Sequence, residues 1–157
     1  MILEEFRLEG DVAVVTGCGK SWTKDLAFAL AEAGASVVVT GGVKDIEREA
    51  KEARNLQNRV IDIPTDLTST REIQSMMRHT LSQFGRIDIL VNNLNLEFGK
   101  PFLKMDQMEL KQVMGANFTS VFLVCKAVGK HMVSQKQGKI INIVPGAAVR
   151  GLANGAA

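Results

Sequence analysis

The sequence contains no tyrosine, one tryptophan and only two cysteines, Cys18 and Cys125. Two cysteines that lie so far apart exclude a disulfide framework and a cysteine-rich metal site. We expect both to be reduced thiols, which is typical of a cytoplasmic protein.

An excess of charge of either sign is also missing. The 19 basic and 17 acidic residues leave a net charge of +2, and the basic residues are scattered along the chain. This balance excludes a nucleic-acid-binding surface or a patch for anionic membranes. The first ten residues, MILEEFRLEG, are acidic where a secretory signal would be basic, and no apolar run approaches the length of a membrane span. We therefore expect a protein of the cytoplasm that binds neither nucleic acid nor membrane.

What the sequence does have is apolar residues in regular patterns. Residues 12–15 form a short apolar run, as expected of a strand that is buried on both faces. Apolar residues then recur at helical spacing from Leu26 to Ala31, Gly34 ends the helix, and a second strand is predicted at 37–39. A strand–turn–helix–strand unit of this kind, residues 11–40, is typical of dinucleotide-binding α/β folds. It predicts a nucleotide site near the N-terminus.

The same alternation continues along the chain. We expect helices over 44–56 and 69–84, with Ser69 and Glu72 capping the second, and a long helical pattern over 105–133 that is interrupted near Gly115. Strands are predicted at 59–63, 87–91 and 138–144. No linker or repeat divides the chain, so we expect residues 1–157 to form one domain. Right-handed crossovers would make it a doubly wound parallel sheet with helices on both faces.

Two other kinds of site do not fit. The tripeptide Gly19–Ser21 ends like a phosphate-binding P-loop, but the required glycine five positions earlier is replaced by Val14. His79 and His131 lie far apart on predicted helices without other ligands at suitable spacing, so we predict no metal site and interpret both as solvated.

The region after residue 100 contains methionines at approximately helical spacing and one conspicuous amide. We interpret Met105, Met108 and Met114 as core packing. Asn117 lies on an otherwise apolar helix face beside Phe118 and Phe122, and a buried amide must find hydrogen-bond partners.

Five segments resemble, in order and separation, those of the short-chain dehydrogenases/reductases. They are FRLEGDVAVVTG (6–17), Thr65-Asp66-Leu67, RIDILVNN (86–93), GANFTSVFLVCKAV (115–128) and GKIINI (138–143). The resemblance implies a Rossmann-like fold, incomplete at its C-terminal side. It also implies hydride transfer between a nicotinamide cofactor and a small alcohol or carbonyl substrate.

The resemblance further implies which residues contact the dinucleotide. In the first loop these are Gly17, Lys20, Ser21 and Trp22. Further along the chain they are Asp66 and Leu67, after the third predicted strand, and Asn93, after the fourth.

Several positions depart from the family pattern. Ser21 and Thr23 replace the second and third glycines of the first loop, where glycine permits close approach of the backbone and of the helix. We therefore expect weakened dinucleotide binding. Trp22 stands where the family has a small aliphatic residue, and we favour a place in the core over one in the pocket wall. Leu94 and Asn95 replace an Ala-Gly pair.

The catalytic residues implied by the family are a tyrosine, a lysine, a serine and an asparagine. Only Asn117, which would position a proton-relay water, is matched. Val144 and Pro145 occupy the place of the serine, and the family interval puts the tyrosine just beyond Ala157. We expect a truncated chain that is inactive as given. The alternative is a non-catalytic nucleotide-binding or protein-interaction module derived from the same family.

The cofactor preference is read after the second predicted strand. An acidic residue there would select NAD, but Gly41 and Gly42 occupy the position, while Lys20 and Lys44 lie nearby in the sequence. This pattern favours NADP(H) over NAD(H), although two solvated lysines explain it equally well. The family resemblance also implies a homo-oligomer.

Overall fold

The computed structural model describes residues 4–17, 22–42, 60–96, 98–146 and 150. Its described strands are β1 (Val12–Thr16), β2 (Ser36–Gly41), β3 (Val60–Pro64), β4 (Ile89–Asn92) and β5 (Lys139–Asn142). All pair in parallel, in the order β3-β2-β1-β4-β5, so β1 lies at the centre. This is the predicted doubly wound sheet.

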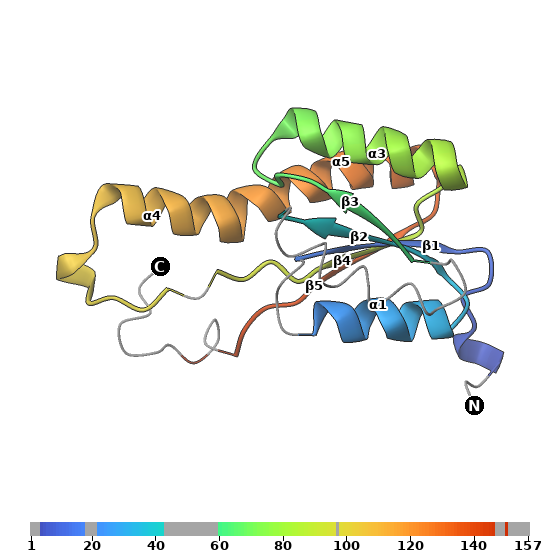
Figure 1. The fold of residues 1–157 in the computed structure, drawn as a ribbon, viewed down its shortest axis with the longest axis horizontal. Helices are drawn as coiled ribbons and strands as arrows, with labels where there is room; N and C mark the ends of the chain where they lie inside the picture. Colours follow the sequence, from blue (N-terminus) through green and yellow to red (C-terminus); the bar gives the residue numbers. More distant parts are fainter. Residues whose placement is uncertain (1–3, 18–21, 43–59, 97, 147–149, 151–157) are drawn as a thin grey trace.

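Helices cover both faces of the sheet (Figure 1). Helix α1 (Thr23–Glu32) lies on one face, and α3 (Thr70–Phe84) and α5 (Ser120–Gln135) lie together on the other. The first residues form a short 3-10 helix, η1 (Glu4–Phe6), and another, η2 (Phe102–Lys104), precedes α4 (Gln107–Met114). The helix expected over 44–56 lies outside the described residues.

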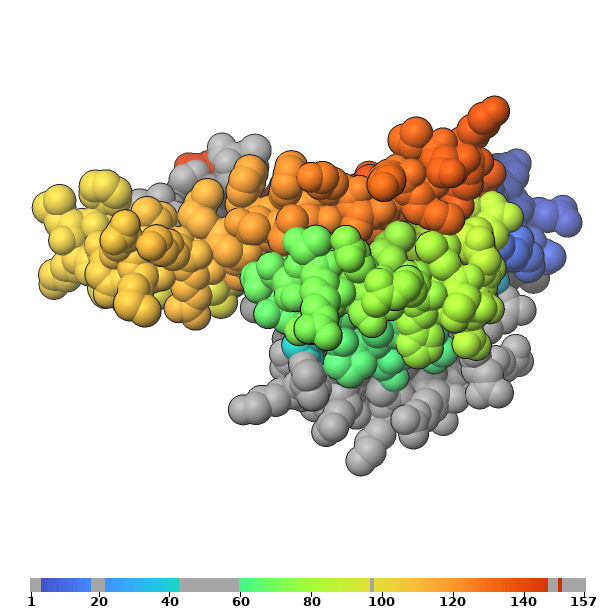
Figure 2. Space-filling model, turned by 90° about the horizontal axis from the view of Figure 1, so that it is seen from above, coloured from blue at the N-terminus to red at the C-terminus, as the bar shows by residue number. Residues whose placement is uncertain are grey.

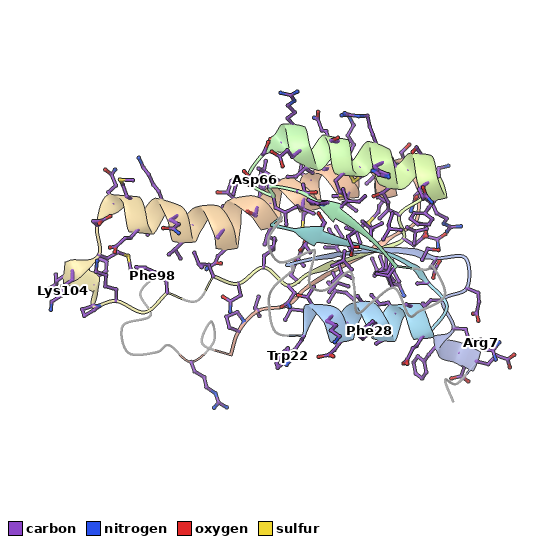
Figure 3. The ribbon with its side chains drawn as sticks, viewed as in Figure 1. Arg7, Trp22, Phe28, Asp66, Phe98 and Lys104 are labelled. Atoms are coloured by element: carbon purple, nitrogen blue, oxygen red, sulfur yellow. The ribbon has the colours of Figure 1, made fainter. Side chains whose placement is uncertain are left out.

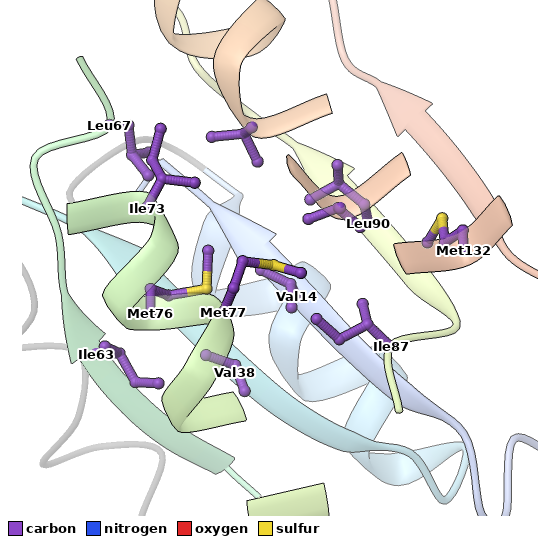
Figure 4. Packing of buried hydrophobic residues seen from close by; sticks show 12 residues of the cluster. Val14, Val38, Ile63, Leu67, Ile73, Met76, Met77, Ile87, Leu90 and Met132 are labelled. Atoms are coloured by element: carbon purple, nitrogen blue, oxygen red, sulfur yellow. The ribbon is translucent and has the colours of Figure 1, made fainter. Parts of the chain in front are cut away.

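The core is divided by the sheet into two layers. On one side, Val15, Val37 and Val91 pack against Ala27 and Ala31 of α1. The other side is larger, and its buried residues come from the strands, from the segments that join β3, α3 and β4, and from α3 and α5 (Figure 4): Val14, Val38, Ile63, Leu67, Ile73, Met76, Met77, Ile87, Leu90, Val124, Val128 and Met132. Apolar residues on both faces of the central strands explain why those strands read as continuous apolar runs.

The helix ends follow from local chemistry. Ser69 accepts a hydrogen bond from the backbone N–H of Glu72, as predicted, but the Glu72 carboxylate accepts from the N–H of Asp66 and not from Ser69. Asp106 and Glu109 form a reciprocal capping box at the start of α4. Gly85, in the left-handed conformation at φ 77°, ends α3.

The long helical pattern is modified near Gly115 but not broken. Helix α4 passes directly into a π-helical turn, η3 (Gly115–Thr119), and then into α5. The combined helix extends well past the sheet (Figure 1), and in the space-filling view its N-terminal part projects beyond the rest of the molecule (Figure 2). None of the described strands reaches this part of the helix. This corrects the predicted core role of the methionines: Met108 is 81% exposed, Met114 45%, and Met105 is half-buried.

An ion pair that the sequence did not indicate lies near the amino ends of β1 and β4. Asp88 is buried, accepts from the backbone N–H of Val12 at 3.0 Å, and forms two hydrogen bonds of 2.7 Å with Arg86. The pair raises the pKa of the Arg86 guanidinium above its ordinary value.

Among the described residues, no helix has the length and apolar character to cross a membrane.

Candidate functional site

The candidate site lies at the carboxyl ends of β1, β2, β3 and β4, where the chain leaves the sheet. In a doubly wound sheet this edge is where ligands bind. Of the predicted cofactor residues, Gly17, Trp22, Asp66, Leu67 and Asn93 lie on segments that meet at this edge. Lys20 and Ser21, like Lys44, lie outside the described residues.

Gly17 is the residue at which the chain leaves β1. Its φ is +101°, and a Cβ added there would lie 2.1 Å from the carbonyl oxygen of Asn93. Its N–H donates to the carbonyl of Thr40 at 3.0 Å, which ties the turn to β2. Only glycine meets both the backbone conformation and the close approach.

Thr23, at the first position of α1, is fully buried. Its hydroxyl donates to the carbonyl of Gly17 at 2.7 Å and accepts from the side-chain N–H of Asn93 at 2.9 Å. The backbone N–H of Asn93 donates to the carbonyl of Thr16 at 3.2 Å. The family pattern has glycine at this position, and Thr23 was expected to weaken dinucleotide binding. In the structure, its side chain instead forms hydrogen bonds that join Gly17 to Asn93.

Trp22 is 66% exposed and adopts a left-handed backbone conformation with φ 73°. The expectation that its ring fills the core is wrong. The reason is the backbone: α1 starts immediately after it, with Thr23 turned inward, and the indole is left on the outside at the start of the helix (Figure 3). Trp22 therefore lies beside the turn as an exposed aromatic surface.

The third predicted strand ends in a network of hydroxyl groups. The hydroxyls of Thr40 and Thr65 lie 2.8 Å apart, and both lie within 3.0 Å of the carbonyl of Ile63. The carboxylate of Asp66 is exposed and accepts from the hydroxyl and N–H of Thr68 at 2.6 and 2.9 Å. These hydrogen bonds hold the pKa of Asp66 below its ordinary value, so it carries a negative charge at neutral pH. The side chain of Leu67 is buried in the core, which leaves only its backbone for a ligand.

A second polar cluster, which the sequence did not reveal, lies where β1, β4 and β5 end beside α5. The side-chain oxygen of Asn92 accepts from the hydroxyl of Thr16 at 3.1 Å, and its amide N–H lies 2.8 Å from the side-chain oxygen of Asn142 and 3.2 Å from the Cys125 sulfur. Burial raises the pKa of the Cys125 thiol. One signal in the sequence could have indicated this cluster: Asn92 and Asn142 each come directly after an apolar run.

Asn117 lies in the π-helical turn η3. Its side chain forms two hydrogen bonds with the backbone of Leu96, accepting from the N–H at 2.6 Å and donating to the carbonyl at 3.0 Å. It is half-buried, and it joins the long helix to the segment that follows β4. The predicted need of this amide for hydrogen-bond partners is met by the backbone of the segment after β4.

The two histidines differ from each other. His79 is exposed, as expected, whereas His131 is half-buried and its Nε2 atom is buried without a hydrogen-bond partner among the described residues. Within the part of the chain that the structure describes, no three histidine, cysteine or acidic residues are grouped as metal ligands.

The amide and hydroxyl groups at this edge of the sheet are thus buried and paired within the protein, whereas the Asp66 carboxylate and the Trp22 indole are exposed. An exposed carboxylate and an exposed indole suit the binding of a polar ligand with an aromatic part. The 157-residue sequence contains no tyrosine, and Val144 and Pro145, both exposed, follow β5.

Comparison with known proteins agrees with this arrangement. Residues 11–157 match the family model described as "short chain dehydrogenase". The 2-dehydro-3-deoxy-D-gluconate 5-dehydrogenase of Escherichia coli K12 is 38% identical over 144 residues, which are 91% of this chain and 56% of that protein. The 3-oxoacyl-(acyl-carrier-protein) reductase of Synechocystis is 36% identical, over 92% of this chain and 59% of its own length.

A solved structure shows the same fold. The actinorhodin polyketide ketoreductase with NADPH superposes with a TM-score of 0.87 at 28% identity, and the match covers 93% of this chain and 57% of that one. The chain therefore spans a little over half the length of the relatives that it matches.

Proposed function

The chain belongs to the short-chain dehydrogenase family, and from this premise we propose that it forms the dinucleotide-binding part of an NAD(P)-dependent oxidoreductase. The observation that carries the proposal is the turn after β1. There a glycine with φ +101° packs against the carbonyl of Asn93 at the carboxyl edge of a parallel sheet. Turns of this kind accept a pyrophosphate at the start of the following helix.

The residues present fit such a cofactor. Gly17 and the start of α1 would face the pyrophosphate, together with Lys20 and Ser21. Asp66 and the backbone of Leu67 would contact the adenine, and Asn93 would lie near the nicotinamide ribose. A bound nicotinamide would supply the hydride. The substrate that we propose is an alcohol or carbonyl compound, as the names of the dehydrogenase and reductase relatives suggest.

NADP(H) is the cofactor that we propose over NAD(H). β2 ends at Gly41, and the exposed Gly42 follows, so no carboxylate stands at the place that selects NAD. A structural neighbour contains NADPH. We also propose a location in the cytoplasm, consistent with the free thiol of Cys125, and a single domain over residues 1–157.

Calorimetric titration of the chain with NADPH and with NADH tests the proposal. We expect NADPH to bind more tightly. Asp66→Asn should weaken binding severalfold, because a carboxylate accepts a hydrogen bond from the adenine amino group more strongly than a neutral amide does. Asp106→Asn is the matched control, since Asp106 is also an exposed carboxylate, and it accepts from two backbone N–H groups at the start of α4. Failure of both dinucleotides to bind, or equal effects of the two variants, would contradict the proposal.

Catalysis by the 157-residue chain is not expected. General acid/base catalysis contributes about a hundredfold or more, and the sequence has no tyrosine to supply it. We predict no oxidation of NADPH above background with mixed carbonyl substrates. Steady turnover that Asn117→Ala abolishes would refute this. If the protein binds a dinucleotide but shows no turnover even when a longer form of the chain is tested, the alternative of a non-catalytic module would be favoured instead.

A further inference from the structure

Thr23 is a buried polar residue at a position where the family pattern has glycine. It is fully buried, yet its branched side chain is accommodated, and its hydroxyl has both a donor and an acceptor partner. A buried hydroxyl that both donates and accepts a hydrogen bond stabilises one particular arrangement of its partners, because a buried polar group without a hydrogen bond costs free energy.

Three residues from separate parts of the chain meet here, and we call them the Thr23 clamp: Gly17, Thr23 and Asn93. Thr23 Oγ1 donates to the Gly17 carbonyl at 2.7 Å and accepts from Asn93 Nδ2 at 2.9 Å. Asn93 is 6% exposed and follows β4, so the clamp joins the end of that strand to the start of α1. Its members are buried, and water therefore does not compete strongly for these hydrogen bonds.

The clamp joins Gly17 and Thr23, the two described ends of the connection between β1 and α1, on the buried side. The Gly17 carbonyl is held by the Thr23 hydroxyl, while the Gly17 N–H is used by Thr40. A carbonyl oxygen carries partial negative charge. If it were not held inward, it would be free to turn toward a bound pyrophosphate and repel it.

We propose that Thr23 is a positioning residue for the dinucleotide site: through the hydroxyl that Asn93 orients, it keeps the Gly17 carbonyl away from the pyrophosphate. This rests on the proposed function. The clamp replaces the close packing that a glycine at this position gives to other members of the family, so Thr23 supports binding where sequence comparison alone predicts that it weakens binding.

The test compares variants by calorimetric titration with NADPH. Thr23→Val preserves the shape of the side chain and removes the hydroxyl, so the Gly17 carbonyl loses this donor and the Asn93 amide loses one of its hydrogen bonds. We expect the dissociation constant to rise about tenfold. Thr23→Ser keeps the hydroxyl and should bind within about twofold of the original chain. Thr23→Gly, which restores the family residue, should also bind more weakly, whereas the glycine-loop interpretation predicts tighter binding.

Thr80→Val is the matched control. Thr80 is also fully buried, and its hydroxyl donates to the carbonyl of Met76 within the same helix, α3, at 3.0 Å. Both valine variants should lower the free energy of unfolding, but only Thr23→Val should lower affinity for NADPH. If Thr23→Val does not fold, Thr23→Ala removes the hydroxyl with less apolar bulk and takes its place.

The outcomes separate the two proposals. Binding by the original chain with unchanged affinity in Thr23→Val overturns the positioning role and leaves the proposed function intact. Equal loss of affinity in Thr23→Val and Thr80→Val also overturns it, because the effect would then be one of general stability. Absence of binding of either dinucleotide to the original chain overturns both proposals.

Discussion

Trp22 and Thr23 are neighbours in the sequence but lie in opposite environments. Trp22 is 66% exposed and Thr23 is fully buried. Trp22 adopts a left-handed backbone conformation directly before α1, with φ 73°, whereas Thr23 is the first residue of the helix. A left-handed conformation is strained for a residue with a large side chain, and such strain is concentrated at functional sites.

The exposed indole yields a direct binding signal. Trp22 is the only tryptophan of the chain and lies beside the proposed pyrophosphate turn, so we predict that NADPH quenches its fluorescence in a saturable way. The control is the double variant Trp22→Phe with Phe6→Trp. It moves the indole to η1, where Phe6 is 65% exposed. Saturable quenching of both proteins alike would show that the signal does not come from this turn.

At the scale of elements, the two helices that cover the larger core end in the same way but with different residues. Helix α3 ends at Gly85 with φ 77°, and α5 ends at Lys136 with φ 58°. Both residues lie in the left-handed region, where a Cβ costs about 1 kcal/mol and glycine costs little. The end of α5 thus carries backbone strain that the end of α3 avoids.

This difference gives a prediction of opposite signs. Lys136→Gly should raise the free energy of unfolding by up to about 1 kcal/mol, and Gly85→Ala should lower it by about the same amount. Both positions are exposed, so side-chain packing contributes little. Urea denaturation measures both changes. A fall in stability of Lys136→Gly would mean that the lysine side chain contributes more than the backbone strain costs.

The start of α4 depends on the charge of Glu109. Lys100 approaches both carboxylate oxygens, at 2.6 and 2.7 Å, and the N–H of Asp106 donates to one of them. The Lys100 ammonium, and then the Asp106 N–H, hold the pKa of Glu109 below its ordinary value. The folded-state pKa is therefore below the unfolded one, and the stabilisation is present at neutral pH and lost as the pH falls through the folded-state pKa.

We accordingly predict that Glu109→Gln lowers the melting temperature at pH 7 and that this difference shrinks toward pH 3. Lys100→Met should reproduce the effect at neutral pH, because it removes the other partner of the same ion pair. Melting curves at several pH values decide it. A constant difference across this range would show that the charge of Glu109 does not matter and that packing does.

At the scale of the whole molecule, apolar surface is concentrated on β5 and on the extended helix. β5 is exposed along its length, with Ile140 40% and Ile141 50% exposed. On the helix, Phe118 and Phe122 are 62% and 53% exposed. Unpaired strand edges and apolar patches of this kind favour association.

We therefore predict that the 157-residue chain self-associates at micromolar concentration and is only marginally stable. Size-exclusion chromatography with light scattering should give a mass above the 17.1 kDa of one chain. Ile141→Lys places a charge on the exposed strand and should reduce association. Phe6→Lys, a change of similar size and exposure on η1, should not. A monomer that melts cooperatively would contradict the prediction.

The sequence alone determined the order of the described strands and α-helices and the class of fold, but not the short 3-10 helices η1 and η2 or the π-helical form of η3. Val14 and Val38 belong to continuous apolar runs, which indicate strands that are buried on both faces. Ile73, Met76 and Met77 are spaced like residues on one face of a helix. Such patterns are local, because each reflects which side of an element is covered. They also identified Gly17, Asp66, Asn93 and Asn117 as candidates through resemblance to a family.

Only the tertiary structure decided which side chains meet. Thr23 and Asn93 are 70 positions apart, and they are brought into contact because β4 pairs with β1. The same strand order brings Asn92 to Asn142, 50 positions away. Trp22 is exposed at a position where the backbone is left-handed, and Met108 is exposed because its helix extends past the sheet. Neither feature is marked by a repeating pattern in the sequence. Contacts between distant residues depend on strand order and register, and no local pattern contains that information.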